Sequence, residues 1–181
     1  MRYLKTVRLK DGRECRIRSG EERDTQAMLD NFVLTHAQTD FLCTYPDETV
    51  RTAADKGQRL QNRLDDPGEV ELLAEVDGIV TGTAGVGRVG TREKLRHRAE
   101  LGISLDAAWW GLGIGRALLE ACIECARSAG YAQLELEVVA DNVRALSLYR
   151  SAGFVEYGRN PKGFRSRLSG WQELVLMRLE L

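Results

Sequence analysis

Two glycine-rich segments contain residue types that could bind a phosphate group. The first, Gly85-Val86-Gly87-Arg88-Val89-Gly90, matches the G-x-G-x-x-G pattern of dinucleotide-binding proteins letter by letter. That pattern has to open a helix with an apolar face, and residues 91–98 offer no such face. We interpret the match as an accident of a glycine-rich strand end.

The second segment, Trp109 to Arg116, follows an expected strand and precedes the clearest helix of the chain. Its glycines would let the backbone approach a ligand, and the free N–H groups and the dipole at a helix N-terminus favour an anion. Arg116 and Leu118 stand where a dinucleotide loop has its third glycine, and no Gly-Lys-Ser/Thr follows. The segment therefore predicts a phosphate-binding loop of another kind; a tight turn whose glycines serve only packing is the alternative.

The elements that must position this loop follow from the hydrophobic pattern. Apolar residues at helical spacing predict a helix over 114–129, between strands at 99–105 and 134–139, and a short helix over 142–152. A β-loop-α-β unit of this kind implies one right-handed parallel crossover. The remaining expected elements are hairpins around Asp11-Gly12 and over 70–89, helices over 21–36 and 46–64, and strands at 154–157 and 173–179.

Together these elements predict a mixed α/β fold, with a largely antiparallel central sheet of about seven strands and helices on both faces. The length of 181 residues fits a single domain, 1–181. Lys and Arg (26) balance Asp and Glu (27), which argues against a nucleic-acid partner. No apolar run is long enough for a membrane span, and the first residues lack a secretory core, so we expect a cytoplasmic protein.

The four cysteines do not form a pattern typical of a disulfide framework. Cys122-x-x-Cys125 could be a redox pair or half of a zinc site, but no second ligand pair follows. Both residues fall in the apolar stripe of the 114–129 helix, where a free cysteine behaves as a small hydrophobic residue. We therefore expect both thiols to be structural and expect no metal site.

The segment that follows the helix makes the glycine loop more specific. Residues 136–154 place Asn142, Ala145, Leu148-Tyr149 and Gly153-Phe154 after a strand. With the loop, this arrangement resembles the GNAT superfamily of N-acetyltransferases. The resemblance covers residues 99–155 well, and the earlier elements agree only in order. Trp110 stands where the family usually has Gln or Arg, which we interpret as the mark of a branch.

The resemblance implies the GNAT fold, acetyl-CoA as co-substrate and a primary amine as acceptor. The amine would belong to an amino acid, a peptide or protein N-terminus, or another small molecule, and would be acetylated by direct transfer in a ternary complex. Pantetheine would pair with the backbone of Ile103, Ser104 and Leu105, and Asn142 would bond the pantetheine arm while also capping its helix. The pyrophosphate would be held by the loop of Gly111, Leu112, Gly113, Ile114, Gly115 and Arg116.

The chemistry of acetyl transfer assigns further candidates. An amine must lose a proton before it can attack, the oxyanion needs hydrogen-bond donors and the leaving thiolate needs an acid. Tyr149 is the candidate acid because of its spacing from Asn142; the alternative is a core aromatic residue. The resemblance implies two candidate bases. Glu137, at the position used by family members that acetylate protein N-termini, is preferred, and Glu100 lies on the central strand, where other branches place a carboxylate; either could instead be a strand carboxylate that faces solvent.

Acceptor specificity in this family comes from the loop between the first two helices and from the last two strands. Here these are residues 35–45 and 159–167. The second segment has four cations, which could bind a carboxylate beside the amine; a solvated basic loop is the alternative. A non-catalytic domain that binds acyl-CoA, as a sensor or an assembly module, remains the alternative function, and a homodimer is left open.

Overall fold

The computed structural model describes residues 1–48 and 52–181. Short 3₁₀ turns, η1 (Glu22–Asp24), η2 (Pro46–Glu48), η3 (Glu93–Leu95) and η4 (Ala107–Trp109), connect some of the longer elements. In chain order these elements are β1 (Leu4–Arg8), β2 (Glu14–Ser19), α1 (Thr25–Ala37), α2 (Ala53–Asp65), β3 (Val70–Val76), β4 (Ile79–Arg88), β5 (Arg98–Leu105), α3 (Ile114–Ser128), β6 (Gln133–Val139), α4 (Val143–Ser151), β7 (Val155–Ser166) and β8 (Gly170–Glu180).

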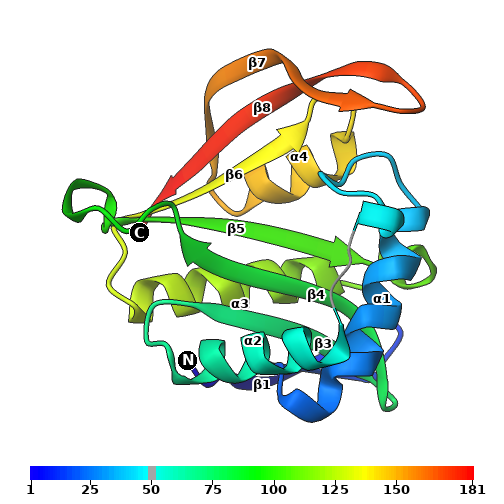
Figure 1. Cartoon of the computed structure of the whole chain (residues 1–181). Coiled ribbons are helices and arrows are strands. Elements are labelled where there is room, and N and C mark those ends of the chain that lie inside the picture. The colour runs from blue at the N-terminus through cyan, green and yellow to red at the C-terminus, as the bar shows by residue number, and fades with distance from the viewer. Residues whose placement is uncertain (49–51) are drawn as a thin grey trace.

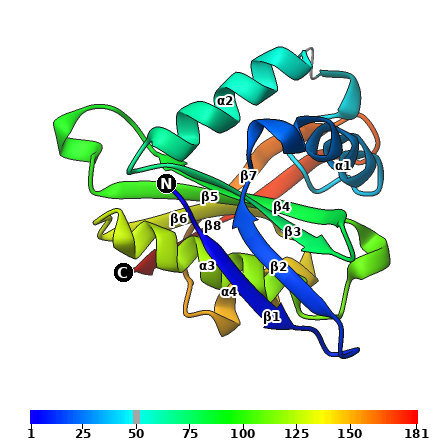
Figure 2. The same cartoon turned by 90° about the horizontal axis from the view of Figure 1, so that it is seen from below.

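The described residues form one sheet of eight strands, in the order β1-β2-β3-β4-β5-β6-β8-β7. The pair β5–β6 is parallel and the other pairs are antiparallel. Helices α1 and α2 cover one face of the sheet, and α3 and α4 cover the other (Figures 1 and 2). This confirms the predicted mixed fold, with eight strands instead of about seven. No helix in the described part of the chain is long and apolar enough to cross a membrane.

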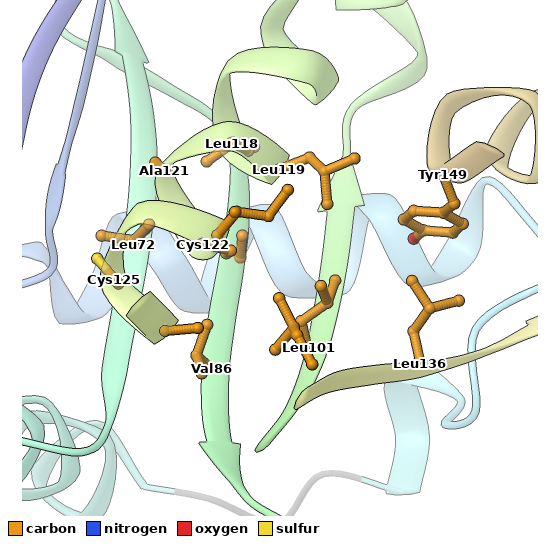
Figure 3. Close-up of a cluster of buried hydrophobic side chains, with 14 of the residues drawn as sticks. Leu72, Val86, Leu101, Leu118, Leu119, Ala121, Cys122, Cys125, Leu136 and Tyr149 are labelled. Atoms are coloured by element: carbon orange, nitrogen blue, oxygen red, sulfur yellow. The ribbon is translucent and has the colours of Figure 1, made fainter. Parts of the chain in front are cut away.

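The main core lies between α3 and the sheet. Helix α3 buries a stripe of mostly small side chains, including Leu118, Ala121, Cys122 and Cys125, and Figure 3 shows them against Leu72, Val86 and Leu101 of the strands. Small residues let the helix approach the sheet closely. The predicted helix therefore forms almost where its periodicity placed it, at 114–128 instead of 114–129.

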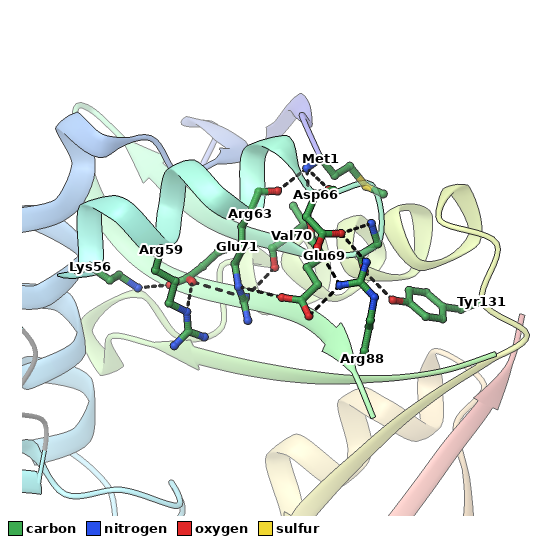
Figure 4. Close-up of polar contacts among 11 residues, drawn as sticks. Met1, Lys56, Arg59, Arg63, Asp66, Glu69, Val70, Glu71, Arg88 and Tyr131 are labelled. Atoms are coloured by element: carbon green, nitrogen blue, oxygen red, sulfur yellow. Dashed lines mark hydrogen bonds and ion pairs between the residues drawn. The ribbon is translucent and has the colours of Figure 1, made fainter. Parts of the chain in front are cut away.

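The opposite face carries a small second core and a set of ion pairs. Met28 and Leu60 of the two helices pack on Leu73. Helix α2 is fastened to β3 through Glu71, whose side chain lies against Lys56 and Arg63 (Figure 4). Burial alone would raise the pKa of Glu71, but these cations hold it below its usual value. A buried carboxylate is tolerated there because it is paired.

Two predicted elements were wrong in extent. The helix expected from Pro46 begins at Ala53, where Thr52 and Asp55 form a capping box; residues 46–48 form a 3₁₀ turn, and 49–51 lie outside the described residues. The strand expected over 154–157 extends over Val155–Ser166, because β7 pairs with β8 up to Ser166, so most of segment 159–167 is strand and not the solvated loop that was its alternative. A register irregularity between Asn160 and Phe164 accommodates the proline of this stretch.

The two thiols of α3 allow a stability prediction. Cys122 is fully buried and Cys125 is 3% exposed, and burial raises the pKa of both, that of Cys125 to about 11. Cys122→Ser should lower the free energy of unfolding by about 1–3 kcal/mol, because a buried hydroxyl would lose its hydrogen bonds to water without a side chain placed to replace them. Thermal unfolding tests this, with Cys43→Ser as an exposed control that leaves Tm unchanged. Loss of turnover in folded Cys122→Ser protein would contradict the structural assignment.

Candidate functional site

Strands β5 and β6 pair over only three residues and then diverge. The parallel ladder joins Arg98–Glu100 to Gln133–Glu135, whereas β6 pairs with β8 along its full length. In Figure 1 the two strands separate toward the C-terminal end of β5. The edge of β5 that faces β6 therefore has no strand partner beyond Glu100 among the described residues. Ile103, Ser104 and Leu105, the predicted pantetheine-binding residues, are half-buried on this stretch.

The glycine loop lies directly beyond this edge and leads into α3. Gly111 and Gly113 have φ angles of +82° and +102°, which favour glycine, and a Cβ at either position would meet no atom of the described residues within 4 Å. Gly113 is the N-cap of α3, and in the part of the chain that the structure describes no side chain caps the first N–H groups of the helix. Ile114 is fully buried and anchors the loop. Open space, free donors and a positive helix end fit a pyrophosphate group.

The rest of the predicted loop has structural contacts of its own. Leu112 packs against the core, and its carbonyl accepts a hydrogen bond from the N–H of Lys10 (3.1 Å). Gly115 approaches Leu148 of α4. The Arg116 guanidinium donates to the Ser151 hydroxyl (2.6 Å) and lies 3.6 Å from the Glu120 carboxylate. Arg116 is thus tied to α4 on the exposed side of the loop.

Trp110 makes a connection that the sequence did not reveal. Its indole N–H donates to the carbonyl of Leu105 (3.0 Å), and the Arg144 guanidinium lies 4.5 Å from the centre of its ring. The residue therefore joins the end of β5 to the start of α4 across the glycine loop. In the sequence Trp110 is visible only as a departure from the family pattern, because neither contact has a signal in the linear spacing.

Asn142 and Tyr149 lie on α4, as predicted. Asn142 caps the helix, its Oδ1 accepting from the N–H of Ala145 (3.1 Å), and its Nδ2 donates to no described residue. The Tyr149 ring lies in the main core with Leu119 and Leu136 (Figure 3), 5.9 Å from the centre of the Phe154 ring. Its hydroxyl bonds no described residue, and burial raises its pKa to about 12. Tyr149 therefore keeps its proton at neutral pH.

Glu100 and Glu137 lie where the two strands diverge. Alternation along β5 and β6 turns both away from the α3 core, whose members include Ala99, Leu101 and Leu136, and both are exposed. Neither forms a hydrogen bond or ion pair with a described residue. Glu135, the ladder partner of Glu100 on β6, does have a charged partner. The Arg98 guanidinium donates a hydrogen bond to its carboxylate (2.7 Å), which lowers the pKa of Glu135. Sequence analysis missed this pair, whose members lie on different strands.

The two predicted acceptor segments meet in space. Asp40 accepts hydrogen bonds from the hydroxyls of Ser166 (2.6 and 2.7 Å) and Ser169 (2.8 Å). Gln38, in the same loop, contacts the residues just beyond β5. Its side-chain amide donates to the Asp106 carboxylate (2.9 Å) and accepts from the backbone N–H of Ala107 (2.9 Å). The loop after α1 is therefore clamped between the β7–β8 hairpin and the end of β5.

The four cations of segment 159–167 have different surroundings. Arg159 pairs with Glu156 and Glu173, and Arg167 pairs with Asp47. Lys162 and Arg165 lie beside the ring of Trp171, within 5.5 Å of its centre. Two of the four are thus already neutralised by carboxylates, so the segment offers less positive charge for an acceptor carboxylate than its sequence suggested.

The arrangement of edge strand, glycine loop and capped α4 can be compared with known proteins. The model of the acetyltransferase (GNAT) family matches residues 31–154. The chain belongs to the GNAT family. It is therefore an acetyl-CoA-dependent N-acetyltransferase, and the function of a non-catalytic binding domain is set aside.

Individual GNAT proteins resemble the chain over most of its length. L-amino acid N-acetyltransferase AaaT of Escherichia coli (strain K12) is 32% identical over 148 residues, 81% of this chain and 86% of AaaT. The crystal structure of ribosomal-protein-alanine N-acetyltransferase from Brucella melitensis has a TM-score of 0.80 at 32% identity, covering 91% of this chain and 99% of that one. The fold is shared by yncA of Salmonella typhimurium, solved with acetyl-CoA (TM-score 0.80, 24% identity, 92% and 94% coverage).

Proposed function

We propose that this GNAT enzyme acetylates the α-amino group of an amino acid or of a peptide or protein N-terminus, with residues 1–181 acting as a single domain. The names of its relatives support both acceptor classes, since AaaT is an amino-acid acetyltransferase and the Brucella protein a ribosomal-protein-alanine acetyltransferase. The observation that carries the proposal is the divergence of β5 and β6 after Glu100, with Glu100 and Glu137 exposed beside it.

In this proposal the chain binds acetyl-CoA between these strands. The backbone of Ile103–Leu105 pairs with pantetheine, although the Leu105 carbonyl already accepts from Trp110. The first N–H groups of α3 and the loop Gly111–Arg116 hold the pyrophosphate, and the free Nδ2 of Asn142 bonds the pantetheine arm. Acetyl-CoA supplies the activated acetyl thioester, and each of these groups orients it.

The chain's own groups then move two protons. Glu137 or Glu100 takes a proton from the amine through water, which frees the lone pair that forms the new N–C bond. Attack on the thioester carbon gives a tetrahedral intermediate. When it collapses, the C–S bond breaks, the sulfur leaves as a thiolate, and the nitrogen gives up its second proton to water. Tyr149 donates a hydrogen bond to that sulfur, and the proton that completes the thiol comes from Tyr149 or from water. Backbone N–H groups near Leu105 stabilise the oxyanion.

Release of the coenzyme A thiol, measured with a panel of amines, tests this function. Amino acids and short peptides should support release and should be recovered as N-acetyl products, identified by mass. Calorimetry should find binding of acetyl-CoA and none of a nicotinamide dinucleotide. Tight binding of the dinucleotide without coenzyme A binding, or a failure of every α-amine to be acetylated, would overturn the proposal.

The choice between the two carboxylates gives a separate prediction. Glu137→Gln is expected to lower kcat/KM on the order of 10²-fold, near the lower end for a general base, because the proton passes through water. Glu100→Gln should have the smaller effect. The relative losses of kcat/KM in the two variants separate the roles, and Glu93→Gln is a control in the η3 turn that precedes β5. A larger loss in Glu100→Gln would exchange the two assignments.

A further inference from the structure

The glycines of this chain can be sorted by what requires them. Seven have a positive φ angle, which favours glycine. At ten of the others a Cβ would meet a neighbouring atom within 4 Å, such as the Leu105 side chain at Gly82 or the Arg63 guanidinium at Gly85. Gly102 alone among the 18 glycines has neither property: its φ is not positive, and no atom of the described residues lies within 4 Å of the added Cβ.

A glycine inside a strand is destabilising relative to other residues, so Gly102 needs a reason. The protein's own conformation and packing supply none, because the position lies in the middle of β5 and is exposed. What remains is a group that is not part of the chain. Backbone that must be approached closely by a ligand is a common reason for glycine in a strand.

The residues around Gly102 indicate which of the two substrates would occupy the space beside it. Gly102 lies on the same face of the sheet as Glu100, about 6.6 Å along the strand, and directly precedes Ile103. Its cross-strand neighbour on β4 is Gly85, and β6 has already diverged on the other side. The free space thus adjoins a candidate base and the stretch of β5 assigned to pantetheine, which is where the acceptor must come.

We propose that Gly102 is a specificity-determining residue that accommodates the substituent on the carbon next to the acceptor's amine. This inference rests on the proposed function and narrows it. The acceptor class is an α-amine on a substituted carbon, as in an amino acid or peptide with a side chain in first position. An amine on an unsubstituted CH₂ leaves this space empty. Unbranched amines and glycine are therefore the poorer acceptors, and their acetylation does not depend on residue 102.

A graded series at this position, Gly102→Ala and Gly102→Val, tests the proposal with matched acceptors. The acceptors are free leucine, free glycine, and two otherwise identical peptides whose first residue is leucine in one and glycine in the other. In Gly102→Val, kcat/KM for the leucine-type acceptors should fall by at least about 10-fold, while the glycine-type acceptors change by less than about twofold. Gly102→Ala should give a smaller loss in the same direction. The Kd of acetyl-CoA should stay constant, and Tm should not fall.

Gly158→Ala is the matched control, since Gly158 also lies in a strand, without positive φ, and its Cβ would touch only the flexible end of Leu176. It should leave both acceptor types unaffected. An equal fold-change in kcat/KM for leucine-type and glycine-type acceptors on going from wild type to Gly102→Val would overturn the inference while acetylation itself stands. Weaker acetyl-CoA binding or a lower Tm in both Gly102 variants would also overturn it, by assigning the glycine to cofactor or fold. A wild-type protein that fails to acetylate any α-amine would overturn the proposed function as well as this inference.

Discussion

Tyr149→Phe is expected to lower kcat on the order of 10²-fold with saturating acetyl-CoA and a working amine, while the Kd of acetyl-CoA changes little. The substitution keeps the ring, which packs in the main core and against Phe154, and removes only the hydroxyl. Because that hydroxyl bonds no described residue, its loss leaves no partner without a hydrogen bond. The folded protein should therefore keep its stability and lose a group that acts on the leaving sulfur.

The magnitude follows from the environment of the phenol. Burial raises the pKa of Tyr149 to about 12, whereas a thiol of the coenzyme type resembles cysteine, near 8.5. Complete proton transfer to the thiolate would be uphill by about 5 kcal/mol. A hydrogen bond from the retained proton still stabilises the developing charge, so we expect the low end of the range found for general acids. The alkaline limb of the pH profile below pH 10 should be the same in wild type and Tyr149→Phe.

Tyr131→Phe provides the matched control. Tyr131 is also buried, but its hydroxyl donates to the carbonyl of Gly68 (2.8 Å), where β3 and β6 begin. Its loss should cost about 1 kcal/mol of stability and leave turnover intact, the reverse of the Tyr149 result. Wild-type turnover in Tyr149→Phe would make Tyr149 a core aromatic residue and leave the thiolate to be protonated by water.

The elements that the sequence predicted well are those with local signals. The strand expected at 134–139 is observed as Gln133–Val139, and α3 ends at Ser128, two residues before Gly130, because periodicity and a glycine act over a few residues. The start of α2 was missed although Thr52 and Asp55 carried a capping-box signal. The length of β7 had no local signal, since it depends on pairing with β8, which lies between β6 and β7 in the sheet.

In the candidate site, too, the sequence placed the residues that have local signals and not those whose contacts are between distant segments. Spacing along the chain placed the glycine loop, Asn142 and Tyr149 together, because they follow one another in a single β-loop-α-β unit and the helix after it. It could not distinguish the carboxylates of neighbouring strands: Glu135 is paired with Arg98, while Glu100 and Glu137 have no such partner among the described residues. Contacts such as Trp110 with Leu105, or Asp40 with Ser166, depend on how distant segments meet in the fold.

Gly113→Asp should weaken acetyl-CoA binding on the order of 10²-fold or more, because a carboxylate within about 6 Å of the pyrophosphate costs about 3 kcal/mol at an effective dielectric constant of 20. The position is the N-cap of α3, and space is open around it. An Asp there would occupy the space proposed for the phosphates and could itself cap the free N–H groups. Calorimetric titration of folded protein measures the change in Kd.

Two controls separate charge from backbone strain, since φ at Gly113 is +102°. Gly113→Asn has the same shape and strain without the charge, so it should bind acetyl-CoA more weakly than wild type but more tightly than Gly113→Asp. Gly130→Asp introduces the same residue at a φ of +80°, also into open space, at the far end of α3. It should reduce stability without changing the Kd. An unchanged Kd in Gly113→Asp would mean that the phosphates bind away from the α3 N-terminus, and equal losses in the Asp and Asn variants would mean that shape, not charge, governs the loop.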